Sequence, residues 1–555
     1  MAQLKYPGVY VQEVPTFPPS VAESSTAIPA FIGFTENTMD GTQNLVGQPV
    51  RITNLLEYQT LFGYAQPSTY VLNVGDPDQP ETTLSVDPTA SKAADRLMGY
   101  QIDLYFKNGG GACYVVSVGK YSDAVTAKPF EEALAALSLE DEPTLYVFPD
   151  ALLLGTGYYA IAQAALKACN HLGDRFTLID VPHETTADAF REGLQAPTYD
   201  LKYGAAYTPY LESNLSFGFN EKEVMVNGLS GEQAPSTGYF QTDAKGLKVA
   251  YHGLASDAPQ VSIVDDSVSS AVERNGNHLT IKVRNGSVSV TTILSKWAEL
   301  TEAEQGSFTL EKLEDGSVPV ASGTTAELLT FDAVPSQGVS LESIKSGRSR
   351  LYNAALKLLQ SNRVTVPPSA IMAGVYAETD RNRGVWKAPA NVPLASVIKP
   401  VTKINNELQG RLNVDDSGKS INAIRSFTGQ GTVVWGARTL LGNDNEWRYI
   451  SVRRLFNTVE ESTAKSTSFA VFEPNDATTW LKVRGMIEAY LFGLYEQGAF
   501  AGSTPEQAYY VNVGLGTTMT PQDILEGRMK IEIGLAAVRP AEFIILKFSH
   551  KLQEA

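Results

Sequence analysis

The stretch ACYVVSV (residues 112–118) decides how the first part of this chain is interpreted. It is short, apolar and rich in β-branched residues, and it follows NGGG (108–111). Those glycines end a helix that we expect over about 91–107, and they form a tight turn. A short apolar run bounded by such signals is typical of a buried strand. We therefore expect residues 112–118 to lie inside a sheet.

The segments on either side of this strand repeat the same pattern. Expected strands are AIPAFIGFT (27–35), TLYVFPD (144–150) and FTLIDVP (176–182), and expected helices lie near 129–138 and over 157–171. An alternation of apolar strands with helices is typical of a mostly parallel sheet. The sequence thus predicts a mixed α/β core, whose first part spans 25–210. Residues 72–92 within it are expected to form an acidic, proline-containing loop.

Residues 211–345 have a different composition, rich in Ser, Thr, Val, Gly, Asn and Asp. Within HLTIKVRNGSVSVTTIL (278–294), Asn285-Gly286 stands between two alternating segments, which is a strong hairpin signal. We predict a β-rich insertion over 211–345. The core is expected to continue over 346–420, beginning with the helical SRLYNAALKLLQSNRVTV (349–366).

Residues 421–540 are predicted to form an α+β C-terminal domain. A helix is expected over 477–497, with Asp476 as its N-cap and Gly498 at its end. Its apolar stripe consists of Trp480, Val483, Ile487, Tyr490, Leu491 and Leu494. In TPQDILEG (520–527), Thr520 caps a second, short helix.

Both ends of the sequence carry an isolated strand signal. GVYVQEV (8–14) lies in an N-terminal arm (1–24) before a proline cluster, and AEFIILKF (541–548) lies in the C-terminal segment 541–555. A lone strand cannot satisfy its own backbone groups, so each needs a partner. The residues alone leave open whether that partner is in the same subunit or in another. The side chains concerned are Val9, Tyr10, Val11 and Val14, and Phe543, Ile544, Ile545, Leu546 and Phe548.

Bulk composition excludes some functions. The chain of 555 residues has 44 Lys and Arg against 61 Asp and Glu, a net charge of −17, which argues against nucleic acid as a partner. Its most apolar window (151–169) contains Gly, Thr, Gln and Lys and is interpreted as a buried helix, so no membrane insertion is expected. We also expect no signal peptide, and the two cysteines fit assembly in a reducing cytoplasm.

No motif points to catalysis. The five histidines show no metal-ligand spacing, and SGKS (417–420) lacks the first glycine of a phosphate loop because residue 413 is Asn413. GGG (109–111) follows a helix and precedes a strand, the reverse of a nucleotide fingerprint. We therefore expect no catalytic residue, cofactor or metal.

Arginine, tryptophan and proline-framed turns are dense after residue 385. Arg425, Arg438, Arg453 and Arg454 could pair with Glu446, Glu460, Glu473 and Glu542. For each arginine alone a solvated side chain is the plainer interpretation. As a set they indicate a charged interface that fixes geometry.

These same stretches resemble the sheath proteins of contractile phage tails and phage-tail-like injection systems. The resemblance rests on co-linear segments over the first 120 residues and from 347 to the end; residues 211–345 do not share it. Its segments are YPGVYVQEV, STAIPAFIGFT, NGGGACYVVSV, VPPSAIMAGVYAETDRNRGVWKAPANVPL, INAIRSFTGQGTVVWGARTL, WRYISVRRLFNTVEES, VFEPND and VRPAEFIILKF.

The resemblance implies a structural protein, not an enzyme. It implies stacked six-subunit rings around an inner tube, linked by terminal arms that pair with a small sheet in neighbouring copies. Contraction of the rings would drive the tube through a target envelope, with the C-terminal domain facing the tube and Lys482 and Arg484 as candidate tube contacts. Implied partners are the chain itself, the tube protein, and baseplate and terminal cap proteins, in a virion tail or an injection particle.

Two alternatives stay open at this stage. An enzyme could hold a cleft in the α/β region 112–210, and it would show a cluster of strongly perturbed titratable groups there. A surface-binding module could use 211–345 as its recognition domain.

Overall fold

The computed structural model describes residues 21–76, 78–229, 236–241, 246–253, 257–313, 319–331 and 338–546. By its internal contacts the chain forms two units. Unit 1 contains residues 1–67, 94–218 and 362–555, and unit 2 contains 68–93 and 219–361. Each unit is therefore built from segments that are distant in the sequence.

The centre of unit 1 is an eight-stranded sheet in the order β27-β26-β10-β9-β8-β1-β7-β4. The six inner strands run parallel, and only the edge strands β27 and β4 are antiparallel to their neighbours. The predicted mostly parallel α/β core is thus confirmed. Its strands are β1 (Pro29–Thr35), β4 (Pro49–Ile52), β7 (Cys113–Lys120), β8 (Leu145–Val147), β9 (Phe176–Asp180), β10 (Gly204–Thr208), β26 (Ile421–Phe427) and β27 (Gly431–Val434).

Helices cover both faces of this sheet because its strands are apolar on both sides. Ile32 and Phe34 of β1 pack in one cluster with α3 and α4, while Phe31 packs in a second cluster with α1, α2 and α11. Neighbouring residues of a strand point to opposite faces, so one strand contributes to both cores. The helices are α1 (Leu55–Phe62), α2 (Met98–Lys107), α3 (Ala127–Leu137), α4 (Tyr158–Leu172) and α11 (Ser369–Arg383).

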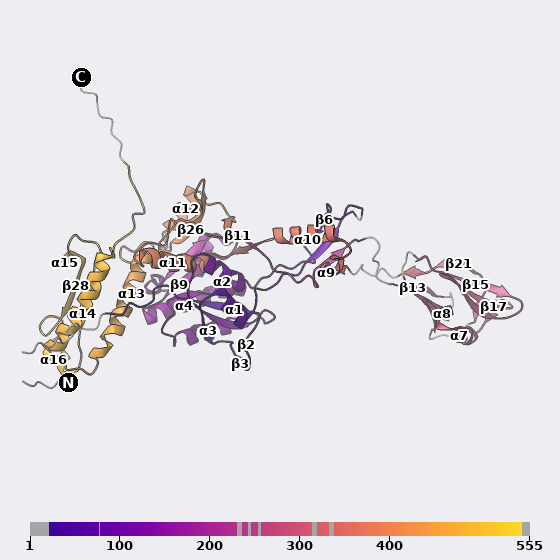
Figure 1. Cartoon of the computed structure of the whole chain (residues 1–555), viewed down its shortest axis with the longest axis horizontal. Helices are drawn as coiled ribbons and strands as arrows, with labels where there is room; N and C mark the ends of the chain where they lie inside the picture. The colour runs from indigo at the N-terminus through magenta and orange to yellow at the C-terminus, as the bar shows by residue number, and fades with distance from the viewer. Residues whose placement is uncertain are drawn as a thin grey trace, which may run out of the picture. The chain divides into compact units, whose positions relative to one another are not determined.

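A smaller C-terminal part of unit 1 has its own apolar cluster. The long helices α13 (Ile450–Thr467) and α14 (Ala477–Glu496) pack with β28 (Tyr509–Val513) and β29 (Ile531–Leu535), and Figure 1 shows α13, α14 and β28 together. Asp476 caps α14 by accepting hydrogen bonds from the Thr478 and Thr479 amides, as predicted. Thr520 and Asp523 form a capping box on α16 (Pro521–Leu525).

Unit 2 has two parts. A four-stranded sheet, β23-β12-β5-β6, lies with the helices α9 (Leu341–Ile344) and α10 (Ser349–Ser361). Its strands are β5 (Val71–Val74), β6 (Leu84–Val86), β12 (Met225–Asn227) and β23 (Val339–Ser340). The expectation of a loop at 72–92 is wrong, because the short strands at 71–74 and 84–86 pair with each other and 71–74 with the distant 225–227.

The outer lobe of unit 2 is two four-stranded sheets that share one apolar core with α7 (Val290–Ala298). One sheet is β19-β14-β13-β22 and the other β16-β17-β15-β21. The strands are β13 (Ser236–Gln241), β14 (Leu247–Gly253), β15 (Gln260–Asp266), β16 (Ala271–Asn275), β17 (His278–Arg284), β19 (Phe308–Lys312), β21 (Thr324–Leu328) and β22 (Thr330–Phe331).

The predicted β-rich character of this block is confirmed, but its hairpin lies elsewhere. The strand β18 (Ser287–Val288), after Asn285-Gly286, pairs with β20 (Val320–Ala321), not with β17. The tight hairpin joins β16 to β17 across Gly276-Asn277. Gly276 has a φ of 62°, which glycine adopts at little cost.

The observed units differ from the predicted boundaries in three places. Residues 68–93 belong with unit 2, and so does α10, which was expected in the core. Conversely β11 (Leu211–Ser216) pairs with β24 (Arg363–Val366) and β25 (Val397–Pro400) in unit 1. The helix expected from 91 begins at Met98. Among the described residues, no helix has both the length and the apolar character needed to cross a bilayer.

Candidate functional site

The candidate site is the pair of places where the terminal segments join the body of unit 1. We call residues 539–542 the C-terminal root and residues 24–28 the N-terminal root. Each lies beside one of the predicted arginines. Their geometry decides how any arm beyond them is held.

The C-terminal root is held by the carboxylate of Glu542. Both oxygens accept from Arg438: Nε lies 3.0 and 3.1 Å from them, and Nη2 lies 2.7 Å from Oε2. Asn413 Nδ2 donates to Oε1 at 2.6 Å, and the Tyr449 hydroxyl donates to Oε2 at 3.2 Å. Two parallel Arg–carboxylate bonds fix orientation as well as distance.

Arg438 is itself tied into the central sheet. Its side chain is only 5% exposed, and its backbone amide donates to Asn422 Oδ1 at 2.8 Å. Asn422 lies on β26 and donates to the carbonyls of Arg438 and of Ala206 on β10. Burial alone would raise the pKa of Glu542. The hydrogen bonds from Arg438 and Asn413 together lower it by more, so the pKa lies below its usual value.

Residues 543–546, which follow Glu542, are apolar and exposed. Phe543, Ile544, Ile545 and Leu546 are 72–81% exposed and lie in no strand. Their role as exchange residues stays a prediction. Phe548 and the N-terminal candidates Val9, Tyr10, Val11 and Val14 lie outside the described residues.

The N-terminal root is held mainly through its backbone. Thr144 accepts from the Ile28 amide at 2.9 Å and donates to the Thr26 carbonyl at 3.0 Å. Arg454 Nη2 also donates to the Thr26 carbonyl, at 2.8 Å. The Ser24 amide donates to Ser462 Oγ of α13 at 3.0 Å.

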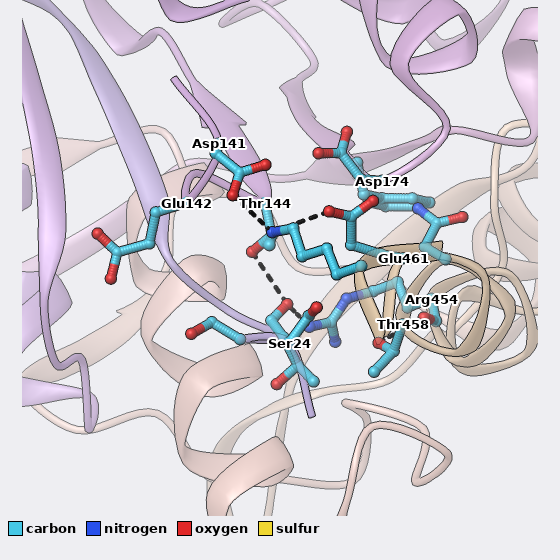
Figure 2. A pocket seen from close by; sticks show the side chains of 13 residues that line it. Ser24, Asp141, Glu142, Thr144, Asp174, Arg454, Thr458 and Glu461 are labelled. Carbon is cyan, nitrogen blue, oxygen red and sulfur yellow. Dashed lines mark hydrogen bonds and ion pairs between the residues drawn. The ribbon is translucent and has the colours of Figure 1, made fainter. Parts of the chain in front are cut away.

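Arg454 is paired with Asp380 of α11, and both side chains are at most 4% exposed. Figure 2 shows the pocket beside this pair, where Ser24, Arg454 and Thr458 lie near one another. The same pocket is lined by the carboxylates of Asp141 and Glu461, which Lys465 bridges at 2.8 Å each. The N-terminal root thus lies across a polar interface between the central sheet and α13.

Two of the four predicted arginines pair with a predicted glutamate. Arg438–Glu542 and Arg453–Glu460 form, and Arg453 also lies 4.2 Å from the Trp447 ring centre. Arg454 pairs with Asp380, not with a predicted glutamate. Arg425 donates to the amide oxygens of Asn406 and Gln409. The solvated interpretation is wrong for Arg438, Arg453 and Arg454, whose side chains are at most 5% exposed.

The small sheet β28–β29 offers open edges. The two strands pair only with each other within the described part of the chain, from Tyr509↔Leu535 to Val513↔Ile531. Each therefore has an outer edge without a partner strand, which is where an added strand can bind. Lys482 and Arg484 lie on the exposed face of α14, where Arg484 pairs with Glu488.

The enzyme alternative predicted perturbed titratable groups in the α/β region, and the buried carboxyl groups of Asp150 and Asp180 are among those present. Burial raises the pKa of Asp150 to about 6 and that of Asp180 to about 7. Both are at most 2% exposed, and Asp180 accepts from the amide and hydroxyl of Ser369. Both carboxyl groups therefore lie in the buried interior of the core.

Asp150 fills the place where doubly wound sheets bind ligands. After β1 the chain crosses to β7 on one side and then to β8 on the other, which makes the carboxyl ends of β1 and β8 a switch point. There Asp150 accepts from the amides of Phe34, Leu97 and Met98 at 2.8–3.2 Å. No group of three or more metal-ligating side chains occurs within the described ranges.

Sequence reasoning missed the side chains that complete both roots. Asp380, Thr144, Asn413, Asn422 and Tyr449 come from five separate places in the sequence. Asp380, Asn422 and Tyr449 lie inside segments that the resemblance singled out, but nothing in their spacing assigns them a partner.

The comparisons with known proteins agree with this geometry. Residues 442–551, which contain α13, α14, β28, β29 and Glu542, match the family described as the phage tail sheath C-terminal domain. This segment is therefore similar to the C-terminal domain of tail sheath proteins. A tail sheath protein of Vibrio phage KVP40 is 28% identical over 185 residues, 33% of this chain and 26% of that protein. The chain thus spans about a quarter of the length of this sheath relative.

Solved sheath structures cover the whole chain. The sheath complex of an extracellular contractile injection system, PVC, in its contracted state has a TM-score of 0.54 and 26% identity, with 100% of this chain and 99% of that chain covered. A chain of the anti-feeding prophage baseplate has a TM-score of 0.56 and 28% identity over 99% and 100% of the two chains. The chain is therefore similar in fold to the subunits of these contractile particles over nearly its whole length.

Proposed function

We propose that this protein is the subunit of a contractile sheath, joined to its neighbours by exchange of terminal strands. The observation that supports it most directly is that one chain contains both an unpaired apolar segment and a small sheet with unpaired edges. Four exposed apolar residues, 543–546, lack a strand partner, and β28–β29 has two open edges. When the segment of one copy pairs with the sheet edge of a neighbouring copy, the backbone groups of both become hydrogen-bonded.

In this proposal Phe543–Phe548 and the N-terminal residues Val9, Tyr10, Val11 and Val14 are the donated strands. The outer edges of β28 and β29 accept them. Donor and acceptor are different surfaces, so each contact leaves a free donor and a free acceptor. Such contacts do not close in pairs, and they generate rings or helical tubes.

The proposal extends to the wider assembly that the resemblance to sheath proteins implies. The copies form stacked hexameric rings around an inner tube, and contraction of the rings drives the tube into a target envelope. Baseplate and terminal cap proteins are the further partners, and Lys482 and Arg484 on α14 are candidate tube contacts. The free energy of contraction comes from better body contacts in the contracted lattice, and no chemical step is needed.

Electron microscopy of the purified full chain tests the proposal. We expect sheath-like tubes or rings from the wild type. Ile544→Asp combined with Leu546→Asp places two charges in the donated strand and should leave dispersed, folded subunits. Val268→Asp is the matched control, because Val268 is equally exposed, at 76%, but lies in the outer lobe. Normal tubes from the double variant would contradict strand donation by this segment.

A further inference from the structure

We infer that Glu542 and Arg438 are positioning residues that pass tension on the C-terminal segment directly to the central sheet, so that β28–β29 is not pulled apart. The inference rests on the proposed function, because a load on this segment arises when a neighbouring copy holds it. It goes beyond that function by naming the path of the force.

The path is continuous from the arm to the sheet. Glu542 is bound bidentately by Arg438, whose amide is bound by Asn422 on β26, and Asn422 donates to Ala206 on β10. Arg438 also donates to the carbonyls of Asn413 and Gly442, so most of its guanidinium donors are engaged. Arg539 adds a second hold on the root by donating to the Asn445 carbonyl at 2.7 Å.

Without this hold, the same force would reach the small sheet. Between Leu535 and Arg539 the described backbone is bonded only to Ala499, Ala501 and Ala508. Leu535 is the end of β29 closest to the arm, so a pull would break the ladder bonds of β29 one at a time. Bonds loaded in sequence fail at a lower force than bonds loaded together, as those on Glu542 are.

The small sheet must stay intact during contraction. In the proposed function β28 and β29 accept strands from neighbours while the same chain's arm is under tension. An arm that unzipped β29 would release those neighbours too. Anchoring the arm on a buried arginine of the eight-stranded sheet separates the donating end from the accepting sheet.

Single-molecule pulling on the full chain tests this path. One handle is attached at the C-terminus and the other at Ser122→Cys, an exposed position in the loop after β7; Cys113 and Cys169 are buried and do not react. For the wild type we expect no rip before the central body unfolds. For Glu542→Gln we expect an earlier rip at a clearly lower force, with about 40 Å of added length from roughly twelve residues at about 3.4 Å each.

Glu142→Gln is the matched control. Glu142 also accepts two bonds from one arginine, Arg51, and one from a tyrosine, Tyr114, but it lies off the path. The control should behave like the wild type. The inference is overturned if the wild type and the control already show the early rip, or if Glu542→Gln lacks it. Because single chains are pulled, this outcome is independent of whether the purified chain forms tubes.

Discussion

The two roots hold their segments in different ways. At the N-terminal root, the body grips backbone groups of Thr26 and Ile28, and the gripping pair Arg454–Asp380 is fully buried. At the C-terminal root, the body grips a side chain of the segment itself, and Glu542 is 22% exposed. One root is part of the folded core, and the other is an attachment on its surface.

This difference separates stability from anchoring. Removing one member of a buried ion pair leaves a charge without compensation, which destabilises the whole domain. In the C-terminal pair Arg438 is buried but Glu542 is 22% exposed, so water can partly replace the lost carboxylate; its removal should cost less free energy but free the segment that it held. We therefore expect damage at the N-terminal root to unfold the protein, and damage at the C-terminal root to leave it folded with a misplaced arm.

The largest effect on assembly should come from removing an arm altogether. Deletion of residues 1–20 should leave a folded subunit with an unchanged melting temperature, since the N-terminal root begins at residue 24. Sheaths able to contract should be lost, as judged by electron microscopy and calorimetry on the same preparation. Assembly of normal, contractile sheaths by the truncated chain would show that this arm is dispensable.

Asp380→Ala should have the largest effect on stability. It leaves the Arg454 guanidinium buried without a carboxylate, and we expect a loss of about 3–5 kcal/mol in the free energy of unfolding. Asp380→Asn keeps a hydrogen-bond acceptor and should cost less. Chemical denaturation of both variants measures the difference, and equal losses would mean that the charge pair is unimportant.

Thr144→Val should have a smaller effect on the N-terminal root. It removes the acceptor of the Ile28 amide and the donor to Thr26, while the shape of the side chain is kept. Leaving a partly buried amide unpaired should cost about 1–3 kcal/mol. A loss below about 0.5 kcal/mol would show that water replaces both bonds.

Acidification should open the C-terminal root before it unfolds the body. The pKa of Glu542 in the folded chain lies below its usual value of 4.5. Its stabilising contribution is therefore present above that value and is lost as the pH falls through the folded pKa. Hydrogen exchange of residues 536–546, corrected for intrinsic rates, should rise as the pH falls in the wild type and show little further rise in Glu542→Gln.

The sequence predicted the central sheet well because its signals are local. The apolar strands at 112–118 and 176–182 and the Asp476 cap of α14 each depend on neighbouring residues. The paired strands at 71–74 and 84–86 were missed because one of their partners lies 154 residues away, at 225–227. Asn285-Gly286 has the backbone of a hairpin turn, with φ of 55° and 82°, but the strands beside it pair elsewhere.

The roots were predictable only in part for the same reason. Arginine and glutamate were correctly expected to pair, and Glu542 was among the candidates. The choice of partner depends on which side chains the fold brings within reach, and Asp380 has no pattern that marks it for Arg454. Long-range polar contacts between separate elements leave no local periodicity in a single sequence.

The pairing of β12 with β23 brings together the two ends of the segment that contains the outer lobe. Met225 lies opposite Ser340, and Val226 opposite Val339, so the chain enters and leaves the lobe through two adjacent strands. A foreign domain whose termini lie as close together could be spliced between residues 228 and 338 without stretching the rest of the protein. The segment between residues 228 and 338 is thus a suitable place to insert a foreign domain into the sheath subunit.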